Sequence, residues 1–353
     1  MSDKWTLVTG ANGFLGAHLV RELVARGHKV KAFVRTGADL RQLQGLPPES
    51  VRIAVGDARV VDRVYAAMNA CDTVYHLAAS VFSDERKKKQ IVADAVEGTE
   101  ATLEAARRAG LRRAVVTSTL FTLGVSERPE PIDETHAFNV DEPNAYAFGK
   151  REGEQKAFAA ASSSLDVVVV NPGMIVGAGD YKPTGTGAMF LNYLKTAPTW
   201  NVPILPGGLN FVDVRDVAIG HVLAMEKGRS GERYVLGGTD LTHREFYTLL
   251  CDLTGLAEPG KDVSRSAANW VALFEELRAR WSGKSPVFTR RLIDNYYGRY
   301  VFLNSDKAKR DLGYEPRPVR EAFANSLRWY VENGYVTREE ARRVRLELRP
   351  AVA

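Results

Sequence analysis

The chain has 353 residues, 45% of them hydrophobic, which is enough for a sizeable core and for two domains or one elaborated domain. Its 48 basic and 43 acidic residues give a net charge of +5, which suits an anionic cofactor and does not indicate a nucleic-acid partner. No apolar run approaches the ~20 residues that span a bilayer, and no secretory leader is recognised. Two distant cysteines, Cys71 and Cys251, favour reduced thiols and a cytoplasmic location, although a single disulfide stays open.

The first predicted elements are a strand at Thr6–Thr9, a glycine-rich turn and a helix. Its glycines are spaced G-x-x-G-x-x-G, which permits a tight turn, a close backbone approach to a pyrophosphate and close helix–strand packing. The helix N-terminus then presents free N–H groups to the anion. A dinucleotide site is therefore predicted, with a purely structural turn as the alternative. Its predicted contacts are Gly10, Asn12, Gly13, Phe14, Leu15 and Gly16.

Strands and helices alternate through the first half of the chain. Further strands are predicted at Val30–Val34, Val51–Val55, Thr73–Leu77, Ala114–Ser118 and Val167–Val170. Helices are predicted between them, notably at Gly98–Ala109 and around Tyr146–Ala161. Short apolar strands that alternate with helices are typical of an α/β fold with a doubly wound parallel sheet, the Rossmann type.

Two residues at strand ends bear on the cofactor. Arg35 follows the second strand, where an acidic residue bonds the ribose 2′-OH and an arginine accommodates a 2′-phosphate. Arg35 therefore favours NADP(H) over NAD(H), with an ordinary surface arginine as the alternative. Asp57 follows the third strand, where it can accept a hydrogen bond from the adenine amine, cap the next helix, or do both.

The predicted catalytic pair is Tyr146 and Lys150. Four residues apart on a helix, they share one face, so Lys150 is expected to lie beside Tyr146 and lower the pKa of its phenol from the usual value of about 10. Such a phenol can exchange a proton with a substrate oxygen. Thr119 directly follows the predicted strand Ala114–Ser118 and is expected at the same edge of the sheet. Its hydroxyl can hydrogen-bond the reacting carbonyl there.

Beyond residue 172 the pattern changes. Five glycines within 173–187 indicate a long functional loop. Phe211–Val217 is predicted to return to the main sheet, and Arg233–Leu236 to form another strand. The apolar helical stripe Trp270–Leu277 is expected to shape the substrate pocket together with the loop, the alternative being core of a small lobe. The charged tail Thr337–Arg349 is predicted to be a surface helix.

These motifs together resemble the extended short-chain dehydrogenase/reductases over essentially the whole chain. The matching segments are Thr9–Gly16, Gly56-Asp57, His76–Ala79, Thr117–Gly124, Tyr146 with Lys150, Asn171–Gly173 and Phe211–Val217. Within that superfamily the chain is most similar to the dihydroflavonol-reductase-like group and to hopanoid-associated sugar epimerases. The segments that carry this closer similarity are Lys182–Gly185, Gly231–Tyr234 and Leu312–Pro318.

The resemblance implies an NADP-binding domain at 1–171 with 208–250, a substrate-binding lobe at 172–207 and 251–336, and a surface tail at 337–353. It implies that Thr119, Tyr146 and Lys150 are catalytic and that Lys150 also bonds the nicotinamide ribose. Further cofactor contacts are implied at Asp57, Ala58, Leu77, Ala78, Ala79, Tyr146, Lys150, Pro172, Gly173 and Ile175. It also implies a homodimer in which helices near 97–109 and 145–160 pair across a two-fold axis.

Two positions depart from the family pattern. Thr119 stands where serine is usual, which keeps the hydroxyl and narrows the pocket. Ala95 stands where the family has asparagine, which removes a side chain that could support a water relay. No clustered Cys/His pattern indicates a metal, and His76 is expected to be a satisfied core residue.

We therefore expect an NADP-dependent oxidoreductase that transfers hydride between nicotinamide and the carbonyl or alcohol of a bulky, hydrophobic small molecule. The alternatives are a nucleotide-sugar epimerase or dehydratase, and a non-catalytic cofactor sensor, which would not need Tyr146 and Lys150. The stretch Gly208–Phe211 has no basic residue to hold a substrate diphosphate, and aromatic residues of 260–300 suit an apolar substrate. Basic residues flank those aromatics and suggest peripheral membrane contact: Arg278, Arg280, Lys284, Arg290 and Arg291.

Overall fold

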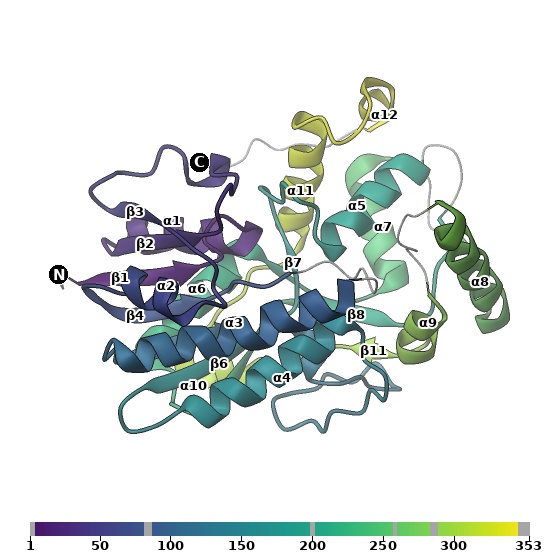
Figure 1. Cartoon of the computed structure of the whole chain (residues 1–353). Helices are drawn as coiled ribbons and strands as arrows, with labels where there is room; N and C mark the ends of the chain where they lie inside the picture. The colour runs from purple at the N-terminus through teal and green to yellow at the C-terminus, as the bar shows by residue number, and fades with distance from the viewer. Residues whose placement is uncertain (1–3, 81–86, 198–201, 257–259, 283–288, 345–353) are drawn as a thin grey trace.

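A seven-stranded parallel sheet forms the centre of the molecule in a computed structural model that describes residues 4–80, 87–197, 202–256, 260–282 and 289–344 (Figure 1). The strand order is β3-β2-β1-β4-β5-β6-β9. Its strands are β1 Trp5–Thr9, β2 Lys29–Val34, β3 Val51–Val55, β4 Cys71–His76, β5 Arg113–Thr117, β6 Asp166–Pro172 and β9 Arg233–Leu236. The order reverses between β1 and β4, and ligands of such sheets bind outside the carboxyl ends of the strands at this point. The predicted doubly wound fold is confirmed.

Helices cover both faces of this sheet. They are α1 Phe14–Ala25 and α6 Val214–Lys227 on one face, and α2 Val61–Ala67, α3 Lys88–Arg108 and α4 Ala145–Ala160 on the other. Successive strand residues point to opposite faces, so Val8 packs in the cluster that contains α1, whereas Leu7 packs in the one that contains α2 and α3. In Figure 1, α3 and α4 run side by side along the same edge of the molecule.

A second, smaller sheet lies beyond β6. It comprises β7 Met174–Val176, β8 Gly208–Asp213, β10 Thr239–Thr242 and β11 Tyr300–Val301. β8 pairs in parallel with β7 and β11 and antiparallel with β10. The prediction that Phe211–Val217 returns to the main sheet is therefore wrong, because a strand pattern does not reveal its partner and Val214 already begins α6. The predicted loop 173–187 also contains β7 and the start of α5.

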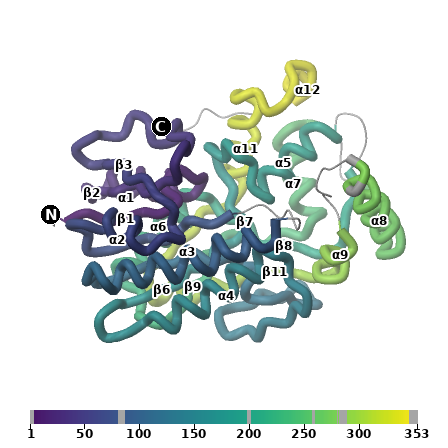
Figure 2. The backbone as a smooth tube through the Cα atoms, viewed as in Figure 1, coloured from purple at the N-terminus to yellow at the C-terminus, as the bar shows by residue number. Residues whose placement is uncertain are grey.

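Most of the remaining helices build the smaller lobe and its connections (Figure 2). They are α5 Gly185–Thr196, α7 His243–Thr254, α8 Arg265–Ser282, α9 Arg290–Tyr296, α11 Arg320–Glu332 and α12 Arg338–Arg343. The helix α10 Asp306–Leu312 packs instead against α6 and β9 beside the main sheet. Four buried rings, those of Phe190, Phe211, Phe246 and Phe323, form the centre of this lobe, with centroids 4.9 to 5.6 Å apart in the contacting pairs. In the predicted tail, α12 buries no residue, and 345–349 lies outside the described residues. The domain boundaries stay a prediction.

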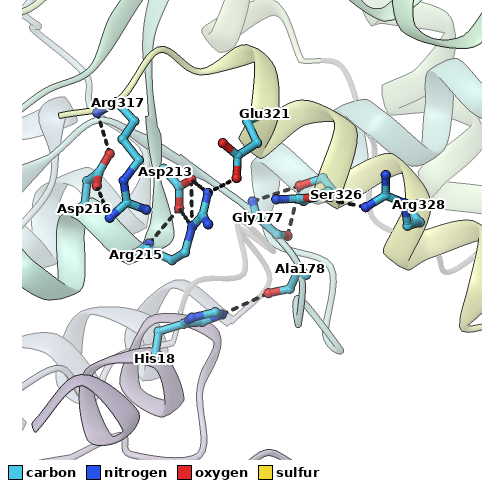
Figure 3. A network of polar contacts seen from close by, with 11 residues as sticks. His18, Gly177, Ala178, Asp213, Arg215, Asp216, Arg317, Glu321, Ser326 and Arg328 are labelled. Atoms are coloured by element: carbon cyan, nitrogen blue, oxygen red, sulfur yellow. Dashed lines mark hydrogen bonds and ion pairs between the residues drawn. The ribbon is translucent and has the colours of Figure 1, made fainter. Parts of the chain in front are cut away.

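A polar network joins the two lobes behind the site (Figure 3). The Ser326 hydroxyl of α11 accepts a hydrogen bond from the Gly177 N–H at 2.8 Å and donates one to the Gly177 carbonyl at 2.9 Å. The Nε2 atom of His18 in α1 lies 2.9 Å from the carbonyl oxygen of Ala178. Arg215 bridges Asp213 and Glu321 at 2.6 and 2.8 Å. The segment after β7 is thus fastened between α1 and α11.

Candidate functional site

The glycine turn after β1 is shaped for close backbone approach. Gly10 has a φ of +69°, and a Cβ there would lie 2.9 Å from the Ala78 nitrogen. A Cβ on Gly16 would lie 2.1 Å from the Gly10 carbonyl oxygen. The Gly13 N–H donates to that same carbonyl at 2.9 Å. Side chains are excluded here, so the loop forms a cradle at the N-terminus of α1 that fits a dinucleotide pyrophosphate.

Thr9 fastens the β4 end against this cradle. Its hydroxyl accepts hydrogen bonds from the backbone N–H groups of Leu77 and Ala78, both at 3.2 Å. Ala79 follows directly, so three predicted cofactor contacts lie beside the glycine turn. The Asn12 side chain donates to the Asp39 carbonyl at 3.2 Å and ties the turn to the loop after β2.

Arg35 and Asp57 lie at the ends of β2 and β3. Arg35 is exposed in the loop after β2. The Asp57 carboxylate accepts from the Arg59 guanidinium at 2.6 Å and from the Arg59 backbone N–H at 3.0 Å, and the Arg59 side chain lowers the pKa of Asp57. The cap of α2 is Val60, so the interpretation of Asp57 as a helix cap is wrong. Its predicted role toward adenine, and that of Ala58, stays a prediction.

Thr119 and Tyr146 are brought together, as predicted. Thr119 caps the short 3₁₀ turn Leu120–Thr122 that follows β5, and Asn144 caps α4 by accepting from the Ala147 N–H at 2.8 Å. The Tyr146 phenol, in the first turn of α4, lies near the Thr119 side chain. Burial raises the pKa of Tyr146 to about 12, whereas Thr119 acts to lower it. The predicted lowering of this pKa is wrong in this structure, because a buried phenolate loses its hydration. At neutral pH the phenol holds its proton, which is the form that can donate.

Lys150 turns toward β5. Its Nζ donates to the Thr117 carbonyl at 2.7 Å, and burial lowers the pKa of Lys150 to about 8, although Glu154 raises it. The Thr117 hydroxyl lies 2.8 Å from Nε2 of buried His221. Burial lowers the pKa of His221 to about 4 and that of His76 to about 3, and the Lys150 charge adds to both effects. The two imidazoles are therefore neutral, and Lys150 carries the positive charge.

His76 is buried as predicted, but it is not fully satisfied. Its Nδ1 atom lies 3.0 Å from the Thr9 hydroxyl and 3.1 Å from the Thr102 hydroxyl. Its Nε2 atom has no partner within the described part of the chain. The ring therefore serves packing between β4 and α3, since Gly98 of α3 faces its Cε1 and Nε2 atoms.

Sequence reasoning missed Glu154, which lies one helical turn after Lys150 and is 4% exposed. The Asn171 side-chain amide donates to the Glu154 carboxylate and the Thr122 hydroxyl, both at 2.9 Å, and to the Thr119 carbonyl at 3.3 Å. Glu154 thus helps to hold Asn171 against the backbone of Thr119. The signal was available: Tyr146, Lys150 and Glu154 recur every four residues on one helix face.

Glu154 also faces a polar cavity of about 430 Å³ on the side of α4 that opens to solvent. Its lining includes Arg151, Arg233 and Lys307. The Arg233 guanidinium lies 3.8 Å from the Glu154 carboxylate. Burial raises the pKa of Glu154, while Asn171 and Arg233 oppose that effect. Glu154 therefore lies between the buried Lys150 and water.

Ala95 lies where α3 and α4 pack closely. Ala95 is buried in α3, and its Cβ would lie 3.1 Å from a Cβ placed on Gly149 of α4. A Cβ on Gly153 would lie 3.1 Å from the Ala95 carbonyl. The close approach of the two helices therefore requires glycine at these two positions of α4.

An apolar cluster begins next to Thr119 in the chain, because Leu120 and Phe121 follow it directly. Phe121, Met174, Leu209 and Tyr296 are partly buried and pack against this cluster, and the rings of Phe121 and Tyr296 meet edge to face at 5.7 Å. The Tyr296 hydroxyl is buried without a hydrogen-bond partner among the described residues.

The segment after β6 meets the second sheet. A Cβ on Gly173 would lie 2.4 Å from the side-chain oxygen of Asn210, so this position needs a glycine. Pro172 ends β6, and Ile175 of β7 packs against the core that contains α1. The three predicted contacts at Pro172, Gly173 and Ile175 thus lie where the chain passes from the first sheet to the second.

The predicted pocket role of Trp270–Leu277 is wrong. α8 turns Trp270 and Phe274 outward, with 72% and 67% of their surfaces exposed, and buries Ala268 and Ala272 instead. The alternative that they are core is wrong for the same reason. Helical periodicity identifies an apolar face but not the direction in which it points.

Three smaller expectations can be compared with the structure. Neither Cys71 nor Cys251 forms a disulfide bond within the described residues. Within the described ranges, no group of three or more His, Cys, Asp or Glu residues could hold a metal ion. No described helix is long and apolar enough to cross a membrane.

Comparisons with known proteins agree with this geometry. Residues 6–237 match the model of the NAD dependent epimerase/dehydratase family. A relative from Synechocystis sp. that is named as a dihydroflavonol 4-reductase is 33% identical over 93% of this chain and 95% of its own. The "Sterol demethylase protein B" of Methylococcus capsulatus is 35% identical, with coverage of 94% and 99%. A ketoreductase of Stigmatella aurantiaca, named for 4-hydroxy-2-methyl-3-oxo-4-farnesyl-3,4-dihydroquinoline-1-oxide, is 32% identical, with coverage of 92% and 95%.

The fold has a solved counterpart as well. The crystal structure of gox2253 superposes with a TM-score of 0.82 at 32% identity and covers 95% of this chain and 100% of that one. The glycine cradle and the residues Thr119, Tyr146 and Lys150 all lie within residues 6–237, the range that matches the family model. The chain therefore belongs to the NAD-dependent epimerase/dehydratase family and is an NAD(P)-dependent oxidoreductase of the extended short-chain dehydrogenase/reductase type.

Proposed function

We propose that this enzyme uses NADPH to reduce a ketone on a bulky, hydrophobic substrate. The observation that carries the proposal is the apolar cluster that contains Leu120 and Phe121, the two residues directly after Thr119, together with Met174, Leu209 and Tyr296. A substrate carbonyl that reaches this pair brings its carbon skeleton against these side chains, and pockets of this composition select apolar ligands.

Thr119, Tyr146 and Lys150 each have a distinct role in the proposed reduction. The reduced nicotinamide, when bound, supplies the hydride to the carbonyl carbon. Thr119 hydrogen-bonds the carbonyl oxygen, and Tyr146 transfers its phenolic proton to that oxygen as negative charge develops. Lys150 carries its charge one helical turn after Tyr146 and would hold the nicotinamide ribose. The raised pKa of Tyr146 supports the reductive direction, because the group starts as an acid.

The choice of NADPH rests on Arg35. This residue is exposed at the end of β2, and the nearby Asp57 is neutralised by Arg59 at 2.6 Å. An arginine pairs with a phosphate through two parallel hydrogen bonds, whereas a carboxylate at this edge would repel it. Arg35 therefore supports NADPH over NADH.

The names of two relatives support the substrate class. One refers to a sterol and the other to a farnesylated quinoline oxide, both bulky and largely apolar. The alternative, a nucleotide-sugar epimerase, needs partners for a diphosphate. At the entrance of β8, Leu209 packs among apolar residues and Asn210 is engaged with Asp240 and Gly238. A buried diphosphate without partners is costly.

The deciding experiment compares two classes of substrate. With bulky sterol-like or isoprenoid ketones we expect NADPH to be oxidised, which is measured as a loss of the absorbance of the reduced nicotinamide. With UDP-sugars we expect weak or no binding in calorimetry. Tight UDP-sugar binding with C4 epimerisation would replace this proposal with the alternative.

We also infer a homodimer formed through α3 and α4. The two helices already pack together through Ala95, Gly149 and Gly153, and the α4 side chain of Phe148 is exposed on their outer side. Isologous contacts of this kind are the commonest oligomer symmetry. Light scattering that shows only monomer at micromolar concentrations would refute it. The small number of cysteines, Cys71 and Cys251, and their wide separation in the sequence support the proposed cytoplasmic location.

A further inference from the structure

Helix α8 presents an apolar stripe to the outside. Trp270, Phe274, Leu277 and Trp281 are spaced four, three and four residues apart, so they share one face, and Trp281 is 93% exposed. The opposite side of the helix buries only small residues, Ala268 and Ala272, against α9 and its neighbours. In Figure 1, α8 lies at the outer edge of the smaller lobe. A soluble monomer rarely exposes so many large aromatic side chains together.

The charge of the chain is concentrated in the same segment. Residues 261–299 contain eight basic and four acidic residues, a net charge of +4 of the +5 for the whole chain. Four arginines of this segment form ion pairs: Arg265 with Asp294, Arg278 with Glu275, Arg290 with Glu276 and Arg291 with Glu142. The sequence around the apolar stripe nevertheless keeps a net positive charge. Aromatic side chains on one face with surrounding basic residues are what an anionic membrane surface binds.

We propose that α8 docks the enzyme on an anionic lipid bilayer, with the stripe of Trp270, Phe274, Leu277 and Trp281 at the boundary between headgroups and acyl chains. The helix would lie in the plane of the surface, since it is too polar to cross it. A single convex helix face suits a lipid surface better than the broad, flat contact that a stable protein dimer needs.

The position of α8 connects this surface to the candidate substrate site. α8 packs on α9, and α9 ends at Tyr296, which belongs to the apolar cluster beside Thr119. An apolar ketone dissolved in the bilayer would thus leave the membrane near the wall of the site. This step of the argument rests on the proposed function, whereas the docking itself does not.

The test measures partition of the full chain onto vesicles. Vesicles of phosphatidylcholine alone are compared with vesicles that contain about 30% phosphatidylglycerol. The probe is cosedimentation together with tryptophan fluorescence. We expect binding to the anionic vesicles that is about tenfold or more stronger than to the neutral ones and that weakens in high salt. A protein that remains in the supernatant with both lipids would overturn the proposal.

Two variants make the test specific. Replacing Trp270, Phe274 and Trp281 by serine should reduce vesicle binding about tenfold or more, because the side chains that insert are removed. Ile53→Ser with Val55→Ser, a change at two exposed apolar positions on β3, is the matched control and should bind like the wild type. Thermal unfolding and NADPH binding report that both variants fold. Vesicle binding by the α8 variant that equals that of the wild type would overturn the proposal. It would also be overturned if light scattering showed a wild-type dimer that becomes a monomer in the α8 variant.

The outcome for the proposed function is separate. If the wild type binds anionic vesicles but reduces no apolar ketone, the proposed function fails and the docking surface stands. If the enzyme reduces such ketones in detergent and ignores vesicles, the docking proposal fails alone.

Discussion

Replacing Glu154 with glutamine tests whether the carboxylate behind Lys150 sets its protonation. Glutamine keeps the shape and can still accept from Asn171, so the main change is the loss of one negative charge. Unit charges roughly 6 Å apart, about one helical turn, interact by about 1.4 to 2.8 kcal/mol at an effective dielectric constant of about 20 to 40. That interaction favours the charged form of Lys150, whose pKa burial has already lowered to about 8.

The sign of the effect follows directly. With a pKa of about 8, about three-quarters of the Lys150 side chains are protonated at about pH 7.5. Removing the Glu154 charge lowers the pKa further, so the protonated fraction at this pH falls by about 3- to 30-fold. Activity that needs the ammonium is then lost at neutral pH and returns as the pH is lowered. The other groups near Lys150 do not compensate, since His76 and His221 are neutral and the Tyr146 phenol is protonated.

The assay is the pH profile of kcat/KM for NADPH-dependent ketone reduction, together with the Kd for NADPH. We expect the alkaline limb of the profile to move to lower pH in Glu154→Gln. Glu152→Gln removes a half-buried carboxylate from the same helix and should leave the profile in place. An unchanged profile in Glu154→Gln, with kcat/KM at about pH 7.5 within about twofold of wild type, would refute the reasoning.

Four further outcomes are expected. Tyr146→Phe should nearly abolish turnover in the absorbance assay while NADPH still binds in calorimetry, because only the proton donor is lost; retained turnover would mean that another group supplies the proton. Thr119→Val should reduce kcat by about 10²-fold or more, in the range for an oxyanion donor, whereas Thr119→Ser should keep most of the rate. Arg35→Asp should weaken NADPH binding by about ten- to a hundredfold and leave NADH binding little changed, since a charge-assisted contact is worth roughly 1.5–3 kcal/mol; equal wild-type affinities for the two cofactors would contradict this. Gly16→Ala should lower the free energy of unfolding in urea by about 1–3 kcal/mol and weaken cofactor binding, because its Cβ would lie 2.1 Å from the Gly10 carbonyl; an unchanged midpoint would contradict the packing argument.

The sequence alone determined the dinucleotide half of the protein. The glycine spacing, the buried β-branched strands and the Tyr146–Lys150 spacing are local patterns, and each reports a local geometry. Because parallel strands end at one edge of the sheet, strand ends that are far apart in the chain could be placed together without coordinates. This is why Thr119 was expected beside Tyr146, and in the structure Thr119 lies close enough to affect the pKa of Tyr146.

The tertiary structure decided which strands pair, how burial shifts pKa values, and which helix faces meet solvent. The pairing of β8 with β7 and β10 instead of the main sheet could not be read from a strand pattern, since a strand does not encode its neighbour. The raised pKa of Tyr146 and the lowered pKa of Lys150 arise from desolvation, which exists only once the surroundings are packed. The outward direction of Trp270 likewise depends on how α8 sits on α9, because periodicity defines a helix face and only packing decides whether that face meets the core or the solvent.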